Sequence, residues 1–213
     1  MDVSEPSIRS LNLVGGRLCL DFANTVDRHR PEIEAECLTS YRALVAWGEH
    51  AGAIRQEVAS HLLTAERKSP AVGKEALRRA VELREGIFRL LLAAIERRAP
   101  PASDLCLLNV VLSQALSRLR LNPLPDDLAL DWPKEDIPLE RVLWPVARSA
   151  AEVLSSPDDL SRLHQCAAED CAWLFLDQSR NRSRRWCDMA NCGNRAKARR
   201  FYAQHHAVQG GRG

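Results

Sequence analysis

Four cysteines near the C-terminus constrain the fold of this chain more than any other feature. They form two pairs, each C-x4-C, separated by fifteen residues: Cys166, Cys171, Cys187 and Cys192. Paired cysteines in short loops suit a tetrahedral zinc ion, and this separation lies in the range of four-cysteine sites. Four thiolates leave no open position for water or substrate, so the sequence predicts one structural Zn²⁺ ion.

Other uses of these cysteines fit less well. Two disulfides would also account for the even number, but we expect a cytoplasmic protein, in which thiols stay reduced. The closely spaced cysteine runs of iron–sulfur clusters are absent from the sequence. A finger with two cysteines and two histidines would need a histidine at 209–211 after His205, and none stands there. His164 is a weaker ligand candidate because four sulfurs are available.

The positive charge of the chain is concentrated around these cysteines. Between Gln178 and Arg200 there are eight basic residues and the single acid Asp188, a net charge of +7, so the rest must carry −5 because the whole chain carries +2. Such asymmetry indicates a C-terminal region that faces a polyanion. A basic run is usually just a solvated surface, and one or two arginines would offset the charge of the zinc thiolates. Eight basic residues against one acidic residue are more than this charge compensation requires.

A helix is predicted after Cys192, with Asn194 as its N-cap. Ala198 and Phe201 are expected to turn toward the metal. The opposite, cationic face would carry Arg195, Arg199, Tyr202 and His206. This segment lacks a broad apolar face, so we expect no membrane binding.

Residues 172–186 have a suitable length for a hairpin that joins the two cysteine pairs. Its aromatic residues are expected to pack over the sulfurs, with Leu174 and Leu176 on the other side of the strand; they are Trp173, Phe175 and Trp186. The hairpin tip, 180–185, supplies a second basic cluster. The candidate nucleic-acid contacts are Arg180, Arg182, Arg184, Arg185, Asn194, Arg195, Lys197, Arg199 and Arg200.

The first 155 residues are predicted to form a mainly helical α+β domain. Apolar residues recur at helical spacing in five segments, the fourth of them N-capped by Ser103; they are 38–50, 54–67, 75–98, 104–119 and 139–154. Hairpins are expected at 117–132 and, unless a strand leads into a helix there, at 11–25. The polar, proline-containing break 155–159 separates this domain, 1–155, from the zinc module, 160–206. The tail 207–213 is expected to be disordered.

The N-terminal domain shows no catalytic signature: it has no glycine-rich phosphate loop, no helix with paired histidines and no nucleophile elbow. We therefore expect no enzyme activity. Asp21, Asn24 and Thr25 follow an apolar run and are candidates for lining a pocket, although these residue types more often cap turns and helix starts. The isolated cysteines are expected to be buried; they are Cys19, Cys37 and Cys106. The start resembles no secretory signal, and no apolar run is long enough to span a membrane.

Three segments resemble two known bacterial families. The segment Ser179–Arg200, SRNRSRRWCDMANCGNRAKARR, closely resembles the CGNR zinc finger, named for residues 192–195. The segments GGRLCLDFANT, at 15–25, and LWPVARSAAEVL, at 143–154, resemble the ABATE domain that accompanies this finger in stress-induced transcription regulators. The resemblance implies a treble-clef finger, in which the first cysteine pair sits on a knuckle, a hairpin follows, and the last ligand lies at the start of the terminal helix.

The function expected from the sequence is transcription regulation through duplex DNA, with an N-terminal domain that senses a small-molecule effector or forms a homodimer. One module of this size contacts few base pairs, and a dimer would extend the site. The alternative is an adaptor that uses the same module to bind RNA or an acidic protein.

Overall fold

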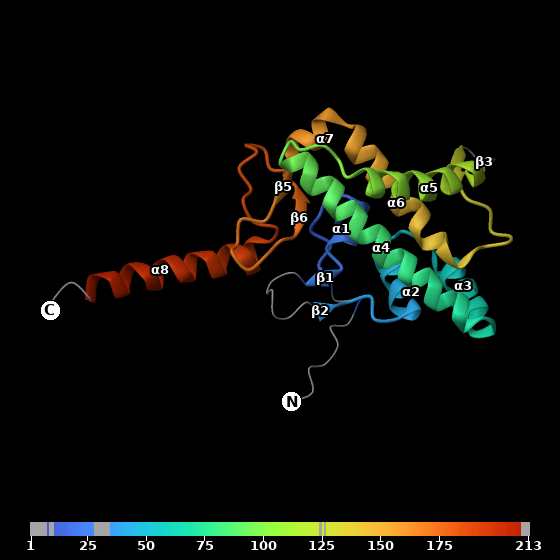
Figure 1. Ribbon diagram of the computed structural model, residues 1–213, viewed down its shortest axis with the longest axis horizontal. Helices are drawn as coiled ribbons and strands as arrows, with labels where there is room; N and C mark the ends of the chain where they lie inside the picture. The colour runs from blue at the N-terminus through green and yellow to red at the C-terminus, as the bar shows by residue number, and fades with distance from the viewer. Residues whose placement is uncertain (1–7, 9–10, 28–34, 124, 126, 210–213) are drawn as a thin grey trace.

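The computed structural model describes residues 8, 11–27, 35–123, 125 and 127–209 (Figure 1). Its N-terminal part is mainly helical, as predicted. The helices are α1 (Leu18–Ala23), α2 (Tyr41–His50), α3 (Gln56–Lys68), α4 (Pro70–Ile95), α5 (Ala102–Arg118), α6 (Leu143–Ser155), which follows the 3-10 turn η2 (Leu139–Val142), and α7 (Pro157–Arg162).

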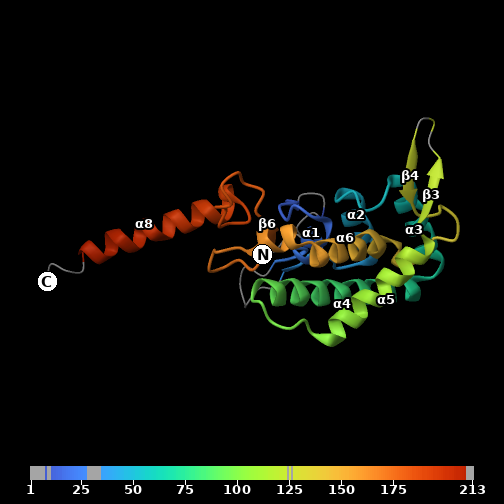
Figure 2. The same cartoon turned by 90° about the horizontal axis from the view of Figure 1, so that it is seen from above.

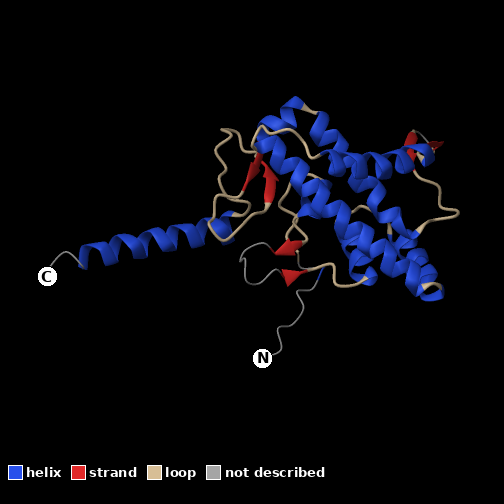
Figure 3. Cartoon of the chain, in the orientation of Figure 1, coloured by secondary structure: helices blue, strands red, loops and turns tan. Residues whose placement is uncertain are grey.

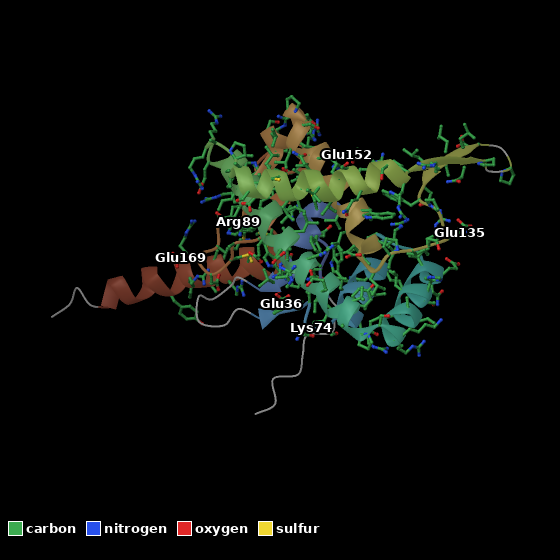
Figure 4. The ribbon with its side chains drawn as sticks, turned by 45° about the vertical axis from the view of Figure 1, so that its right-hand side comes forward. Glu36, Lys74, Arg89, Glu135, Glu152 and Glu169 are labelled. Atoms are coloured by element: carbon green, nitrogen blue, oxygen red, sulfur yellow. The ribbon has the colours of Figure 1, made fainter. Side chains whose placement is uncertain are left out.

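Helix α4 lies at the centre of this helical body and contacts α1, α2, α3, α5 and α6. Its buried face recurs every three or four residues and includes Leu83, Ile87 and Leu91, which is the periodicity that predicted the helix. The interior also holds charged groups, among them Arg84, which donates two hydrogen bonds of 2.7 Å to the carboxylate of Glu36, labelled in Figure 4. A buried guanidinium requires such a partner.

The strands form three separate antiparallel pairs (Figure 3). They are β1 (Val26–Asp27) with β2 (Ala35–Glu36), β3 (Arg120–Pro123) with β4 (Leu128–Asp131), and β5 (Leu163–Gln165) with β6 (Leu174–Leu176). The hairpin predicted within 117–132 is therefore confirmed. In 11–25 the second apolar run forms helix α1, and residues 11–17 form no strand.

One predicted helix start was wrong. Ser103 does not cap α5, which begins at Ala102; Pro101 occupies the N-cap position, with an extended backbone and no side-chain hydrogen bond to the helix. The break at 155–159 is short, because Pro157 starts α7 and the Ser156 hydroxyl caps it by accepting a 3.2 Å hydrogen bond from the Asp159 N–H. Proline here begins a helix.

Strands β5 and β6 share the apolar core of the helical body. Leu163, Leu174 and Leu176 are at most 4% exposed and belong to the same buried cluster as the residues of α1, α4 and α6. The chain beyond β6 extends away from the body and ends in helix α8 (Asn194–Gln209), while the β3–β4 hairpin projects from the far end (Figures 1 and 2).

Helix α8 continues into the segment expected to be a disordered tail, so residues 207–209 are helical; residues 210–213 lie outside the described part of the chain. Within the described residues, no helix combines the length and apolar character needed to cross a membrane. The longest, α4, carries charged residues along its exposed face.

Candidate metal centre and basic surface

The first cysteine pair lies at the tip of the β5–β6 hairpin. Leu163 pairs with Leu176 and Gln165 with Leu174, so the knuckle from Cys166 to Cys171 closes the hairpin. The Cys166 N–H donates a 2.9 Å hydrogen bond to the Trp173 carbonyl, which holds the knuckle in place. The hairpin predicted within 172–186 was thus wrong, because the partner of β6 precedes the first cysteine.

The four predicted ligands meet in one buried cluster. The Sγ atoms of Cys166, Cys171, Cys187 and Cys192 all lie within 4.8 Å of one another. Cys187 Sγ is 3.7 Å from Cys171 Sγ and 3.6 Å from Cys192 Sγ. A zinc tetrahedron with Zn–S bonds of about 2.3 Å has S–S edges of about 3.8 Å. These separations fit a tetrahedral metal site and are far longer than the S–S bond of about 2.05 Å in a disulfide.

The charges of the sulfurs also call for a cation. Hydrogen bonds from Cys171 and Cys187 hold the pKa of the Cys166 thiol well below its usual value, while hydrogen bonds with Cys166 and Cys171, together with burial, raise the pKa of Cys187. Four adjacent sulfurs therefore become thiolates together only when a metal neutralises them. Two donors assist: the Cys187 N–H points to Cys166 Sγ at 3.4 Å, and Arg195 Nη2 lies 3.3 Å from Cys192 Sγ.

The aromatic packing around the sulfurs follows the prediction. Phe175 is fully buried in the cysteine cluster, and Trp173 and Trp186 pack against that cluster while remaining partly exposed. Leu174 and Leu176 point the other way, into the core of the helical body. Strand β6 therefore belongs to two cores, one on each face, as its period of two requires.

The loop after β6 is organised by Asp177, which sequence reasoning missed. Its buried carboxylate accepts 2.8 Å hydrogen bonds from the N–H groups of Ser179 and Arg184. Burial opposes ionisation, but these hydrogen bonds prevail and lower the pKa of Asp177. The sequence shows an aspartate at position 177. It does not show that the carboxylate accepts hydrogen bonds from backbone N–H groups of the following loop, because such bonds leave no pattern in the sequence.

Arg184 belongs to the interior of the zinc module. Its guanidinium lies 4.4 Å from the Phe175 ring centroid and donates to the carbonyls of Val14, Trp186 and Cys187. Three carbonyl acceptors and an aromatic face satisfy a half-buried guanidinium without any external anion. This arginine therefore joins the N-terminal segment to the second cysteine pair.

The terminal helix starts before the predicted cap. Asp188 caps its first turn, a π-helical segment Met189–Gly193, by accepting a 2.9 Å hydrogen bond from the Ala190 N–H. Asn194 lies inside the continuous helix, where its Nδ2 donates to the Ala190 carbonyl at 3.0 Å. The prediction that Asn194 caps the helix was wrong. Cys192, the last ligand, lies in this first turn, as expected.

The outer part of α8 projects away from the metal. Ala198 is exposed and Phe201 is 56% exposed, so neither turns toward the sulfurs as predicted. The reason is geometric: beyond its first turns α8 projects away from the rest of the described chain (Figure 2). Arg195, Arg199 and Tyr202 are exposed as predicted, whereas the side chain of His206 lies outside the described residues.

Ion pairs divide the predicted nucleic-acid contacts into two groups. Arg195 and Arg199 lie 3.7 and 3.1 Å from the carboxylate of Asp170 in the knuckle, and Arg182 lies 3.4 Å from Asp158. The remaining exposed basic residues have no acidic partner within the part of the chain that the structure describes; they are Arg180, Arg185, Lys197 and Arg200.

A groove of about 390 Å³ lies between the knuckle and α8. Its walls include Arg185, Arg199 and Arg200 together with the ring of Trp186, and Arg185 lies 5.6 Å from that ring. Glu169, labelled in Figure 4 beside the start of α8, is its one acidic wall residue. The groove combines a cationic rim with an aromatic face.

Asp21, Asn24 and Thr25 hold the chain together. Asn24 is 4% exposed and exchanges two 2.9 Å hydrogen bonds with the backbone of Leu174, so it clamps β6 to α1. Thr25 donates to the Phe22 carbonyl at 2.8 Å, and Asp21 accepts from the Gly15 N–H at 2.8 Å. These contacts support the capping interpretation of the three residues.

The paired glycines complete this clamp. The Gly15 carbonyl accepts a 2.8 Å hydrogen bond from the Leu176 N–H, and a Cβ at Gly15 would lie 2.7 Å from the Leu20 Cβ. Gly16 has a φ of +81°, which favours glycine. Of the isolated cysteines, Cys19 and Cys37 are buried as predicted, whereas Cys106 is exposed on α5.

Comparison with protein families agrees with this architecture. Residues 162–205 match the CGNR zinc finger, and residues 16–157 match ABATE, described as "Putative stress-induced transcription regulator". Fold and site together define a zinc-finger protein with one structural zinc site, at which four clustered sulfurs lie within ligand distance of one another. The chain belongs to the ABATE family, whose match covers most of its length. A comparison with curated proteins gives no match.

Proposed function

We propose that this protein is a cytoplasmic, non-catalytic transcription regulator whose zinc module binds duplex DNA. The observation that carries the proposal is a set of exposed basic side chains, in the loop after β6 and on α8, that have no acidic partner among the described residues: Arg180, Arg185, Lys197 and Arg200. Cations without acidic partners are available to neutralise phosphates and release counterions. Arg184 is excluded as a contact because its donors are used inside the module.

The zinc ion acts as a scaffold in this proposal. It fixes the knuckle and the first turn of α8 against each other, so the exposed arginines are presented on a rigid surface. Arg195 and Arg199, paired with Asp170, brace the same two elements and contribute less to binding than the unpaired group. The module is expected to be a treble clef and to serve as a separate binding unit joined at 155–160.

The test is binding of the full, zinc-loaded chain to mixed-sequence duplex DNA across a series of salt concentrations, measured by fluorescence anisotropy. The double variant Arg185→Gln/Arg200→Gln is expected to bind more weakly and to lower the slope of log K against log salt by about 2, because each lost phosphate contact removes about one unit. The matched control, Arg42→Gln/Lys74→Gln, removes the same charge from exposed positions of the helical body. Equal slopes for both variants would refute the proposal.

Selection of genomic fragments on the purified protein tests regulation itself. Recovery of a shared sequence is expected for a specific regulator, and light scattering of the complex tests the proposed homodimer. If the selected fragments share no sequence, the proposal of sequence-specific regulation is wrong, even if DNA binding weakens with salt as expected.

RNA binding is the second candidate, favoured by the groove beside the metal. Trp186 and Arg185 offer an aromatic face and a cation to an unstacked base, which single-stranded RNA presents and duplex DNA does not. Competition between duplex DNA and single-stranded RNA decides between the candidates. The variant Trp186→Leu should weaken only RNA binding if the groove takes a base.

A further inference from the structure

Arg141 is a buried cation whose hydrogen bonds are incomplete. It lies in η2, is 4% exposed, and its guanidinium lies beside two neighbouring indoles, 4.5 Å from the Trp132 centroid and 5.4 Å from the Trp144 centroid. Among the described residues, its Nε and Nη1 atoms have no hydrogen-bond partner. The nearest carboxylate oxygen, Asp131 Oδ1, stands 3.7 Å from Nη2, beyond hydrogen-bond range.

The electrostatics of this arginine differ from those of Arg84. Both guanidinium groups are buried, but Glu36 binds Arg84 at 2.7 Å and its pKa stays high, whereas burial lowers the pKa of Arg141. A buried charge without full hydrogen bonding is costly, on the order of a few kcal/mol. An anion that reached Arg141 would remove that cost.

A cavity of about 280 Å³ lies directly beside Arg141. Its walls come from the start of α3, from β4 and from the loop after β4, where Figure 4 labels Glu135. Three basic side chains line it, against two acidic ones, Glu57 and Asp131; the basic residues are Arg55, Lys134 and Arg141. Trp132 adds an aromatic wall, with its indole N–H already bound to the Ala115 carbonyl at 2.7 Å.

Asp131 is not a sufficient partner for these cations. Its Oδ1 already accepts a 2.8 Å hydrogen bond from the Trp132 N–H, and its two oxygens are each 3.7 Å from an arginine, Arg141 and Arg55. One carboxylate shared at that distance between two guanidinium groups leaves donors of both available. The lining as a whole therefore carries three basic side chains against two acidic ones, a small excess of positive charge.

We propose that this cavity binds a small anionic metabolite that carries a carboxylate or phosphate group, with the anion on Arg141 and the body of the ligand against Trp132. A volume of about 280 Å³ admits a planar organic acid and is near the lower end of ligand pockets, at about 300 Å³. Arg55 and Lys134 stand at the rim and attract the anion. This anion site is distinct from the zinc module, and the proposal does not depend on which nucleic acid the zinc module binds.

The position of the cavity suits an effector. Arg141 immediately precedes α6, α6 packs against α1, and α1 contacts β6 of the zinc module. Ser149 of α6 also accepts a 3.2 Å hydrogen bond from the Cys19 N–H of α1. A continuous set of packed helices thus joins the cavity to the strand that carries the knuckle.

The test uses the full-length, zinc-loaded protein and two probes, inorganic phosphate and benzoate, titrated calorimetrically at constant ionic strength against chloride. Binding of at least one probe in the millimolar range is expected, and the tighter of the two identifies the anion class. The rim variant Arg55→Gln/Lys134→Gln should weaken it about tenfold or more, since charged hydrogen bonds contribute about 1.5–3 kcal/mol. Arg141→Met should abolish it.

The control Arg148→Gln removes an exposed arginine of α6, paired with Glu152, and should leave probe binding unchanged. The rim variant alters only exposed or rim side chains, so it keeps the test decisive if Arg141→Met fails to fold. Absence of binding by both probes, or equal binding by the rim variant and the control, would overturn the proposal. DNA binding by the same samples is read separately, so the two proposals fail independently.

Discussion

The helical body and the zinc module reach stability by different means. The body buries a continuous apolar core that includes Trp47, Phe22 and the leucines of α4. The interior of the zinc module consists of four cysteines, Ala168 and Phe175, with Val14, Trp173 and Trp186 against it. So small an apolar interior cannot offset the chain entropy lost on folding, whereas a zinc tetrathiolate can. In the zinc module, metal binding therefore supplies the stabilisation that apolar burial supplies in the helical body.

The boundary between these regions is unusually well joined. Asn24 binds the backbone of Leu174, Gly15 binds that of Leu176, and Arg17 forms a 3.1 Å ion pair with Asp159. These residues belong to the segment that resembles ABATE, so that segment serves to hold β6 in place. The zinc module is thereby tied to the body at one edge and free at the other.

Removal of zinc should have the largest effect. Chelation is expected to unfold the knuckle, the loop and the start of α8, because structural zinc contributes about 10–16 kcal/mol to folding in finger peptides. The helical body should remain folded. Limited proteolysis should then cut after residue 177 while the body resists. Cys187→Ser should behave like chelation, and the exposed Cys106→Ser should not. Equal protease resistance with and without zinc would contradict the comparison.

Loss of the clamp should have the next largest effect. Asn24→Ala leaves a buried N–H and a buried carbonyl of Leu174 without partners, so we expect a loss of about 2–4 kcal/mol in the free energy of unfolding. Denaturant unfolding of the zinc-loaded chain measures it. Asn109→Ala, at an exposed position of α5, is the matched control and should change stability little. A loss below that of the control would show that the clamp is dispensable.

The pH dependence of stability should reveal Asp21. Burial raises its pKa to about 6 from 3.8, partly opposed by the Gly15 N–H and His50. The folded state therefore binds the proton more tightly than the unfolded state, and stability falls as the pH rises from about 4 to about 6. Asp21→Asn removes this loss and should stabilise the protein at pH 7 by about 3 kcal/mol, because each pKa unit corresponds to about 1.4 kcal/mol. The difference between variant and wild type, measured at pH 4 and pH 7, isolates this group from the zinc thiolates.

The smallest effect is expected for the exposed ion pair between Arg182 and Asp158, separated by 3.4 Å. Exposed pairs contribute about 0–1 kcal/mol, so Arg182→Gln, which leaves the 3.2 Å pair of Asp158 with Arg162 in place, should lower stability by no more than about 0.5 kcal/mol. High salt should erase the difference in a denaturation curve. A larger loss would mean that α7 and the loop after β6 are coupled more strongly than their exposure suggests.

Long, periodic helices could be predicted from the sequence, while helix ends and local partners could not. The apolar stripe of α4 follows from spacing alone, whereas the cap at Asp188 in place of Asn194 depends on where the chain leaves the second cysteine pair. The expected hairpin within 172–186 failed for a similar reason. The apolar face of β6 had to meet the body, and β5 supplied the neighbouring strand.

The sequence by itself determined the zinc ligands, because two C-x4-C pairs bring four soft donors together whatever surrounds them. It also determined the sign of the surface near them. Only the tertiary structure decided which basic residues are available, since Arg184 is turned inward and Arg195 and Arg199 meet Asp170. The same holds for Arg141, whose burial beside the Trp132 ring depends on where the β3–β4 hairpin packs. The two cysteines of each metal-binding pair are close in sequence, so the sequence reveals them. The acidic residues, carbonyls and aromatic rings that contact these arginines include groups from other parts of the chain, so only the tertiary structure reveals those.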